Sequence, residues 1–261
     1  MSNDTTSPDQ SHQILARASG ASIAYHAVAG SSSNSLPGII FMTGFMSDMT
    51  GGKALALEQL ARERELAFLR FDYQGHGQSS GEFAEGTIGL WAEDALAVLD
   101  ELTEGPQILV GSSMGGWMML LTARTRPERI AGLVGIAAAP DFTEDLLRQE
   151  LTAEQMAEVE ENGFVVVPSE FEDDYTFTKA LFDDGKEHLV LREEIPLDCP
   201  VRLLHGLNDQ SVPWQTALTI QEKLRSEDVE VTLIKNGDHR LSEDADLARL
   251  TRTVSALVDS L

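Results

Sequence analysis

Apolar residues along the chain form short continuous runs, separated by stretches in which apolar positions recur at helical spacing. Continuous runs are typical of strands buried on both faces of a parallel sheet. They predict strands at 21–29, 38–42, 66–71, 107–110, 130–138, 201–204 and 229–234. The helical spacing predicts helices at 52–65, about 87–102, 114–126, about 213–224 and about 242–261. This alternation predicts an α/β fold, with a mostly parallel sheet flanked by helices on both faces.

Two segments depart from the alternation. The turn-prone residues 30–35 join the first two predicted strands, which we expect to form a hairpin. A longer insertion, at about 141–196, separates two core strands. It contains a glutamate-rich helical part at 144–161, followed by two extended parts at 164–167 and 175–178. Long insertions in compact domains are usually functional, so we expect a small lid over the active-site end of the sheet; the alternative is a surface excursion without function.

Composition adds bounds on domain organisation and location. With 261 residues, 42% of them hydrophobic, the chain suits one domain at 14–261 after a disordered polar tail at 1–13. The polar start does not resemble a signal peptide, and no apolar run approaches the ~18 residues of a membrane span. A single cysteine, Cys199, excludes an internal disulfide framework. From these features we expect a cytoplasmic location.

The charge balance bears on partners. The net charge is −24, from 43 acidic and 19 basic side chains, and long-range repulsion then disfavours nucleic acids and anionic membranes. A solvated acidic surface accounts for this charge without a specific cation-binding role.

The strongest chemical motif follows the predicted strand 107–110. The sequence Gly111-Ser-Ser113-Met-Gly115 fits G-x-S-x-G, the nucleophile elbow that exposes a serine on a tight turn between strand and helix. Glycines at both flanks let the two backbones approach closely. The motif is short enough to arise by chance, but its position between a strand and a helix makes Ser113 the candidate nucleophile.

A serine nucleophile needs a base, and the base needs an orienting acid. Among six histidines, His239 follows the last predicted strand and precedes the last helix, where this architecture places its base. The acid should lie between Ser113 and His239 in the chain. We choose Asp209, after the next-to-last strand, over Asp141, after the strand before the insertion. The alternative for His239 is an incidental loop histidine.

Asp238 neighbours the base but is the weaker candidate for the acid, because it points along a loop. His76 and His205 follow other predicted strands, and either could line the site without acting as the base.

The oxyanion of an acyl intermediate needs two backbone donors. We expect the N–H of Met114, after the nucleophile, and the N–H of Phe45, in the loop after strand 38–42. Apolar side chains near these loops are candidates for an acyl pocket, with core packing as the alternative: Met46, Trp117, Phe142 and Leu146.

These parts predict a serine hydrolase that attacks an acyl carbonyl and passes through an acyl-serine intermediate. No metal or organic cofactor is expected, and Gly75-x-Gly77 lacks the third glycine of a dinucleotide fingerprint. The alternatives are a serine peptidase or amidase and a non-catalytic binding module, although none of the three catalytic residue types is lost.

With these residues identified, the chain from about residue 21 to 261 resembles the α/β-hydrolase superfamily. It looks most similar to the branch of the mitochondrial acyl-protein thioesterase, on the segments 71–75, 111–117, 199–206, 211–214 and 238–240. The resemblance implies a hydrolase of acyl thioesters or carboxylic esters, with Ser113, Asp209 and His239 as triad. It implies hydrolysis of S-acylated cysteine and of acyl glucuronides, so the expected substrate is a small-molecule or S-acylated ester or thioester. The chain departs from that branch in its acidity and in lacking a basic transit segment, which suggests a bacterial-type relative.

Overall fold

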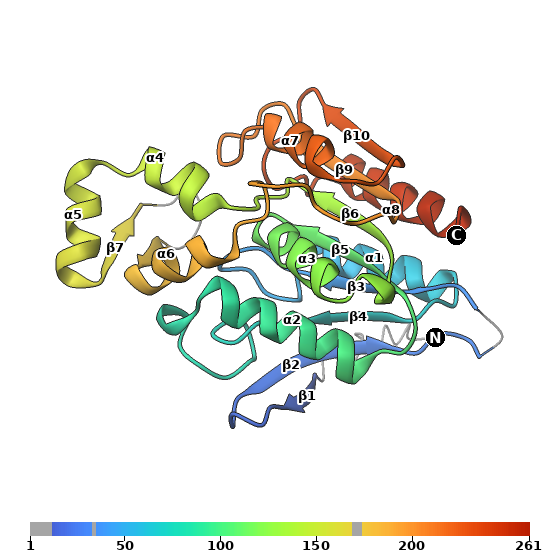
Figure 1. Cartoon of the computed structure of the whole chain (residues 1–261). Helices are drawn as coiled ribbons and strands as arrows, with labels where there is room; N and C mark the ends of the chain where they lie inside the picture. Colours follow the sequence, from blue (N-terminus) through green and yellow to red (C-terminus); the bar gives the residue numbers. More distant parts are fainter. Residues whose placement is uncertain (1–11, 33–34, 169–173) are drawn as a thin grey trace, which may run out of the picture.

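A computed structural model describes residues 12–32, 35–168 and 174–261, in which helices flank a central sheet and the segment predicted as a lid projects to one side (Figure 1). Within the described residues, eight strands form the main sheet. In chain order they are β1 (Gln13–Ala16), β2 (Ser22–Val28), β3 (Gly38–Met42), β4 (Phe68–Phe71), β5 (Gln107–Ser112), β6 (Ile130–Ile136), β9 (Val201–Gly206) and β10 (Val229–Ile234). Most neighbouring strands in this sheet are parallel, which confirms the predicted fold class.

The strand order across the sheet is β1-β2-β4-β3-β5-β6-β9-β10. From β4 to β10 every pairing is parallel, whereas β2 pairs antiparallel with β1 and with β4. The expected hairpin between the first two predicted strands is therefore wrong. β4 lies between β2 and β3, because strand pairing is decided by contacts distant in sequence and not by the turn alone.

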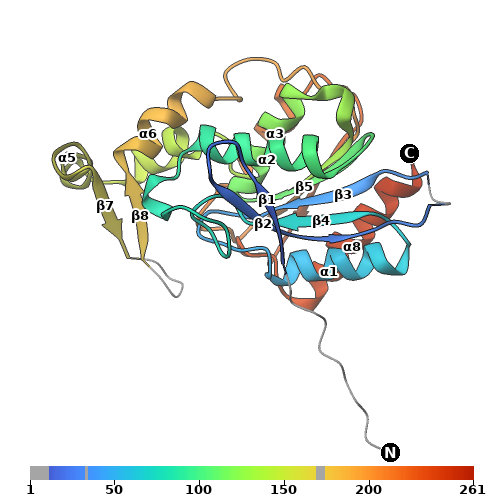
Figure 2. The ribbon, with the colours of Figure 1, turned by 90° about the horizontal axis from the view of Figure 1, so that it is seen from below.

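Helices cover both faces of the sheet, as predicted (Figure 1; Figure 2). One face carries α1 (Gly52–Glu63) and α8 (Asp244–Asp259), and the other carries α2 (Ile88–Leu102), α3 (Met114–Thr125) and α7 (Gln215–Lys223). Short 3₁₀ turns occur at Phe83–Glu85, Pro127–Arg129 and Lys186–His188. In the described part of the chain, no helix combines the length and apolarity needed to cross a membrane.

The continuous apolar runs are explained by burial on both faces. Along β3, Ile40 and Met42 join the core under α2 and α3, while Ile39 and Phe41 join the core under α1 and α8. Successive strand residues point to opposite faces, so a strand covered on both sides is apolar at most of its positions.

The insertion after β6 extends beyond the carboxyl ends of the parallel strands (Figure 1; Figure 2). Its elements are a π-helical turn (Thr143–Leu147), α4 (Arg148–Glu150), α5 (Ala153–Asn162), β7 (Phe164–Val167), β8 (Tyr175–Thr178) and α6 (Lys179–Gly185). β7 and β8 form an antiparallel hairpin. The helical part predicted at 144–161 is broken near Thr152, whose side chain forms a capping box with Gln155 and starts α5. The helix α6 was not predicted.

Residues 1–11 of the predicted tail lie outside the described residues. Gln13, which we assigned to that tail, instead opens β1 and pairs with Tyr25 of β2. The strand was missed because four residues at a sheet edge carry too short a pattern to be seen.

Candidate active site

Ser113 lies on the sharp turn between β5 and α3. Its backbone has φ 53° and ψ −120°, a conformation that L-residues rarely adopt and that costs about 1–3 kcal/mol. The turn is held from the neighbouring strand: the N–H of Ser113 donates to the carbonyl of Ile136 at 2.9 Å, and the N–H of Ala139 donates to the carbonyl of Ser113 at 3.0 Å. The backbone of β6 therefore sustains the strained turn.

The flanking glycines of this turn leave no room for a side chain. A Cβ at Gly111 would lie 2.3 Å from the carbonyl oxygen of Gly115, and one at Gly115 would lie 2.2 Å from that of Met42. Both distances are far below contact distance, so α3 can approach β5 and the end of β3 as it does only with glycine at both positions.

Ser113, His239 and Asp209 form a continuous chain of hydrogen bonds. Nε2 of His239 lies 3.1 Å from Oγ of Ser113, and Nδ1 of His239 lies 2.8 Å from Oδ2 of Asp209. Because the carboxylate can only accept, Nδ1 carries the hydrogen, which leaves Nε2 free to accept the serine proton. The arrangement can convert the Ser113 hydroxyl into a nucleophile.

The loops that carry the acid and the base are joined to each other. The N–H of Asn208, beside the acid, donates to the carbonyl of Gly237 at 2.9 Å. On the other side of His239, the ammonium of Lys53 on α1 donates to the carbonyl of Arg240. Burial, followed by the charge of Arg240, lowers the pKa of Lys53 from 10.5 to about 8. Helix α1 and the turn after β9 thus fix the histidine loop.

The carboxylate of Asp209 is buried and saturated with donors. Oδ1 accepts the N–H groups of Ser211 at 2.9 Å and Val212 at 2.8 Å, while Oδ2 faces His239 and, at 3.2 Å, Nε2 of His205. Burial alone would raise the pKa of Asp209, but the hydrogen bonds from His205 and His239 outweigh it and hold the pKa far below its usual value. Asp209 is therefore ionised at neutral pH.

The two rival acids are occupied elsewhere. Asp141, fully buried, accepts the N–H groups of Val190 at 2.8 Å and Leu191 at 2.9 Å, so its carboxylate ties the start of the lid segment to its end. Asp238 accepts the N–H of Leu241 at 2.9 Å within its own loop.

Three other histidines, His26, His76 and His188, make contacts away from Ser113. Nδ1 of His26 lies 3.6 Å from Glu58, and Nε2 of His188 lies 3.4 Å from Asp184 in the lid. His76 is buried among aromatic rings. His239, by contrast, is placed against Ser113.

The backbone segments that carry the two expected oxyanion donors adjoin the serine. Met114 opens α3, and the first N–H groups of a helix have no intrahelical acceptor. The loop of Phe45 touches the elbow, since a Cβ at Gly44 would lie 3.4 Å from Cβ of Ser113 and 3.5 Å from the carbonyl oxygen of Ser112. The elbow and the loop after β3 thus bring both backbone segments to the same place.

The side chain of Phe45 anchors this loop in an aromatic cluster. Its ring lies 4.9 to 6.2 Å, centroid to centroid, from rings of the 3₁₀ turn Phe83–Glu85, α2 and the lid: Phe83, Trp91, Phe142, Tyr175 and Phe177. The loop that carries a candidate oxyanion donor is therefore packed directly against the lid.

The four candidate pocket residues differ in exposure. Met46 follows Phe45, has φ 53° and keeps 37% of its surface exposed. Phe142 is buried and Leu146 half-buried at the start of the lid. Trp117 is fully buried and donates its Nε1–H to the carbonyl of His188 at 3.0 Å. Trp117 thus connects the elbow helix to the end of the lid.

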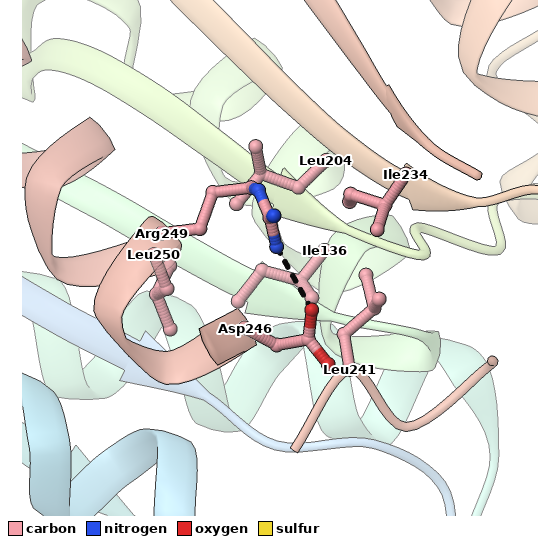
Figure 3. Close-up of a pocket in the computed structure, with 7 residues that line it drawn as sticks. All are labelled: Ile136, Leu204, Ile234, Leu241, Asp246, Arg249 and Leu250. Atoms are coloured by element: carbon pink, nitrogen blue, oxygen red, sulfur yellow. Dashed lines mark hydrogen bonds and ion pairs between the residues drawn. The ribbon is translucent and has the colours of Figure 1, made fainter. Parts of the chain in front are cut away.

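A small cavity lies on the opposite face of the sheet, under α8 (Figure 3). Its volume is about 10 Å³, which is the space of about one water molecule. Apolar side chains and the ion pair of Asp246 with Arg249 line it: Ile136, Leu204, Ile234, Leu241, Asp246, Arg249 and Leu250. A cavity of this size cannot hold an acyl substrate. Among the described residues, no group of three or more His, Cys, Asp or Glu side chains is arranged to hold a metal ion.

Sequence reasoning named two residues near this site but missed their roles. His205 reaches the carboxylate of Asp209, and its position four residues before the acid was the available signal. Asp141 was weighed only as an acid, whereas the structure uses it as a link across the lid segment.

Comparisons with known proteins agree with this architecture. A family model described as serine aminopeptidase, S33, matches residues 33–163. A bovine palmitoyl-protein thioesterase, ABHD10, is 42% identical over 250 residues, which cover 95% of this chain and 80% of the relative. The solved structure of mouse α/β hydrolase domain-containing protein 10 superposes with a TM-score of 0.87 at 41% identity, covering 96% of this chain and 99% of that one. The crystal structure of a putative hydrolase from Agrobacterium vitis S4 gives a TM-score of 0.90 at 41% identity, and the match covers 95% of this chain and 98% of that one.

These comparisons correct one expectation. The bovine, mouse and human relatives are all named as mitochondrial proteins, so the cytoplasmic location that we expected is wrong. That expectation rested on absent targeting features and on a single cysteine, and a single cysteine is compatible with any reducing compartment.

Proposed function

The chain belongs to the α/β-hydrolase family, and from that premise we propose that it hydrolyses S-acyl thioesters and related carboxylic esters through an acyl-serine intermediate on Ser113. The observation that carries the proposal is the pair of hydrogen bonds that His239 makes, 3.1 Å to Ser113 and 2.8 Å to Asp209. This is the geometry that a nucleophile, a base and an orienting acid require.

Acylation begins when Oγ of Ser113 attacks the acyl carbonyl while Nε2 of His239 removes the hydroxyl proton. The carbonyl oxygen becomes an oxyanion that accepts hydrogen bonds from the N–H groups of Met114 and Phe45. The bond to the leaving sulfur or oxygen then breaks, and His239 returns the proton to the leaving group. Asp209 stays ionised throughout and stabilises the imidazolium.

Deacylation repeats these steps with water. His239 removes a proton from a water molecule, whose oxygen attacks the acyl-serine carbonyl and forms a second oxyanion. When the ester bond breaks, the proton passes from His239 to Oγ of Ser113, and the carboxylic acid leaves. All atoms come from the substrate, water and these side chains.

The substrate class follows from the relatives and the lining side chains. The bovine relative is named a palmitoyl-protein thioesterase, which favours a long apolar acyl chain on sulfur. Met46, Phe142 and Leu146 lie at the oxyanion loop and the start of the lid, where such a chain would contact them. Methionine adapts to irregular apolar shapes and suits a flexible chain.

Steady-state hydrolysis of matched p-nitrophenyl esters and acyl-coenzyme A or S-acyl-peptide thioesters, from C2 to C16, tests the proposal. We expect thioester hydrolysis that rises with chain length and is abolished in Ser113→Ala. The neighbouring Ser112→Ala serves as the control for elbow folding and should stay within a few-fold of the wild type. Full activity in Ser113→Ala would refute the proposed nucleophile, and equal rates at every chain length would refute the acyl pocket.

A serine peptidase is the second candidate, favoured by the description of the matching family model. Peptide bonds have a poorer leaving group, so the same triad would have to hold a peptide terminus in place during the reaction. Aminoacyl-p-nitroanilides, assayed beside the thioesters, separate the two activities. Faster turnover of the anilides would assign a peptidase.

A further inference from the structure

We propose that His205 is a positioning residue, which donates its Nε2–H to Asp209 and holds that carboxylate in place for His239. The proposal rests on the proposed function, because it concerns the acid of the same triad. Nε2 of His205 lies 3.2 Å from Oδ2 of Asp209, the oxygen that also accepts Nδ1–H of His239.

The hydrogen-bond partners determine which nitrogen of His205 carries a hydrogen. Nε2 also lies 3.0 Å from the carbonyl oxygen of Val212, and a carbonyl can only accept. Nε2 is therefore the donor, shared between the carbonyl and the carboxylate. Nδ1 is buried and has no hydrogen-bond partner among the described residues, so a second hydrogen there would have no acceptor. The ring thus acts as a neutral donor aimed at the acid.

The position of His205 in the sheet leaves the ring little freedom. Leu204, the preceding residue of β9, points into the small cavity under α8 (Figure 3), so His205 points to the opposite face. There it is fully buried, beside its register partner Leu233 on β10. The backbone turn that follows β9 brings Asp209 back against it.

The four donors around Asp209 divide into two pairs. Backbone N–H groups of Ser211 and Val212 hold Oδ1, and the side chains of two histidines share Oδ2. The backbone pair alone leaves the carboxylate free to tilt about Oδ1. The donor from His205 restricts that motion and keeps Oδ2 beside Nδ1 of His239.

The shared oxygen also has an electrostatic consequence. A donor on Oδ2 takes up part of the negative charge that would otherwise stabilise protonated His239. His205 and His239 are the titratable side chains bonded to this carboxylate. Without His205, the full negative charge on Oδ2 stabilises protonated His239. The neutral imidazole that can accept the proton of Ser113 then forms only at higher pH.

The test compares the pH profiles of kcat/KM for wild type, His205→Leu and His205→Gln on one acyl-thioester. The leucine variant lacks the donor, so we expect the acid limb of its profile, where kcat/KM falls at low pH, to move to higher pH by about half a unit. We expect its kcat/KM at neutral pH to fall about tenfold. The amide of glutamine has two N–H groups for the same two acceptors and should restore the wild-type limb. A purely structural residue would lower activity without moving the limb.

An unchanged acid limb in a folded His205→Leu protein would overturn the proposal. If neither variant folds, ¹⁵N spectra of histidine-labelled wild-type protein decide the matter, because the proposal requires a protonated Nε2 and an unprotonated Nδ1 at His205. The opposite tautomer would overturn it. Loss of the proposed function has a different signature, namely activity retained in Ser113→Ala whatever the profile of the His205 variants.

Discussion

The carboxylate of Asp141, at the start of the lid segment, accepts a 2.9 Å hydrogen bond from the backbone N–H of Leu191, fifty residues later. The side chain is fully buried and takes the N–H of Val190 at 2.8 Å with its other oxygen. Burial raises the pKa of Asp141, and the two backbone donors oppose that rise. One side chain thus joins both ends of the lid, next to the site.

Asp141→Asn should loosen the lid. The amide nitrogen cannot accept, so one buried backbone N–H loses its partner, at a cost of about 1–3 kcal/mol. We expect faster hydrogen exchange at Val190 and Leu191 and faster proteolysis within the lid. Asp183→Asn is the matched control, because Asp183 pairs with Lys179 and Lys186 at the exposed surface of the lid, and exposed ion pairs contribute little to stability. Equal exchange rates in the two variants would contradict the assigned link.

Gly111→Ala should disrupt the elbow. Its Cβ would lie 2.3 Å from the carbonyl oxygen of Gly115, a backbone atom that cannot move away by rotation. We expect a loss of about 3 kcal/mol or more in the free energy of unfolding, measured by urea denaturation. Gly52→Ala at the start of α1 is the control. Its nearest neighbour would be 3.8 Å away, and alanine favours a helix, so this change should be neutral or slightly stabilising.

Asp209→Asn should lower kcat by about 10³–10⁴-fold while the fold persists. The asparagine amide can donate to Nδ1 of His239, and the imidazole then carries its hydrogen on Nε2 and cannot accept the proton of Ser113. Asp238→Asn provides the comparison, since that carboxylate neighbours His239 in the chain but accepts the backbone N–H of Leu241. It should remain within a few-fold of wild-type activity in the same thioester assay.

His76 should make the fold sensitive to acid. Burial lowers the pKa of His76 from 6.5 to about 4, because its ring lies among Tyr73, Phe83 and Trp91 and its Nε2 is without a hydrogen-bond partner among the described residues. A folded-state pKa below the unfolded value means that the unfolded chain binds the proton first. The resulting stability is complete above pH 6.5 and is lost as the pH falls towards 4.

Over that window the wild type should lose about 3 kcal/mol more than His76→Phe, which has no proton to bind. Urea unfolding of both proteins at pH 7, 5.5 and 4 measures the difference, and the other titrating groups cancel in the comparison. Parallel stability curves would mean that His76 is protonated as easily in the folded protein as in the unfolded chain.

The local sequence pattern was sufficient to predict the fold class and the candidate nucleophile of this protein. The continuous apolar runs of β3, β5, β6 and β9 require burial on both faces, and Gly111 and Gly115 around Ser113 require a tight strand-to-helix turn. Both are properties of a few neighbouring residues, so the parallel α/β fold and the candidate nucleophile could be predicted from the sequence alone.

Pairing between distant segments was decided only by the tertiary structure. The turn at 30–35 indicated a hairpin, yet β4 separates β2 from β3 because side-chain packing across the sheet outweighs one turn. Asp141 and Asp209 both follow core strands, and the sequence favours one only by its position in the chain. Their roles diverge through contacts made elsewhere: backbone N–H groups at the far end of the lid occupy Asp141, whereas Asp209 faces His239 and His205.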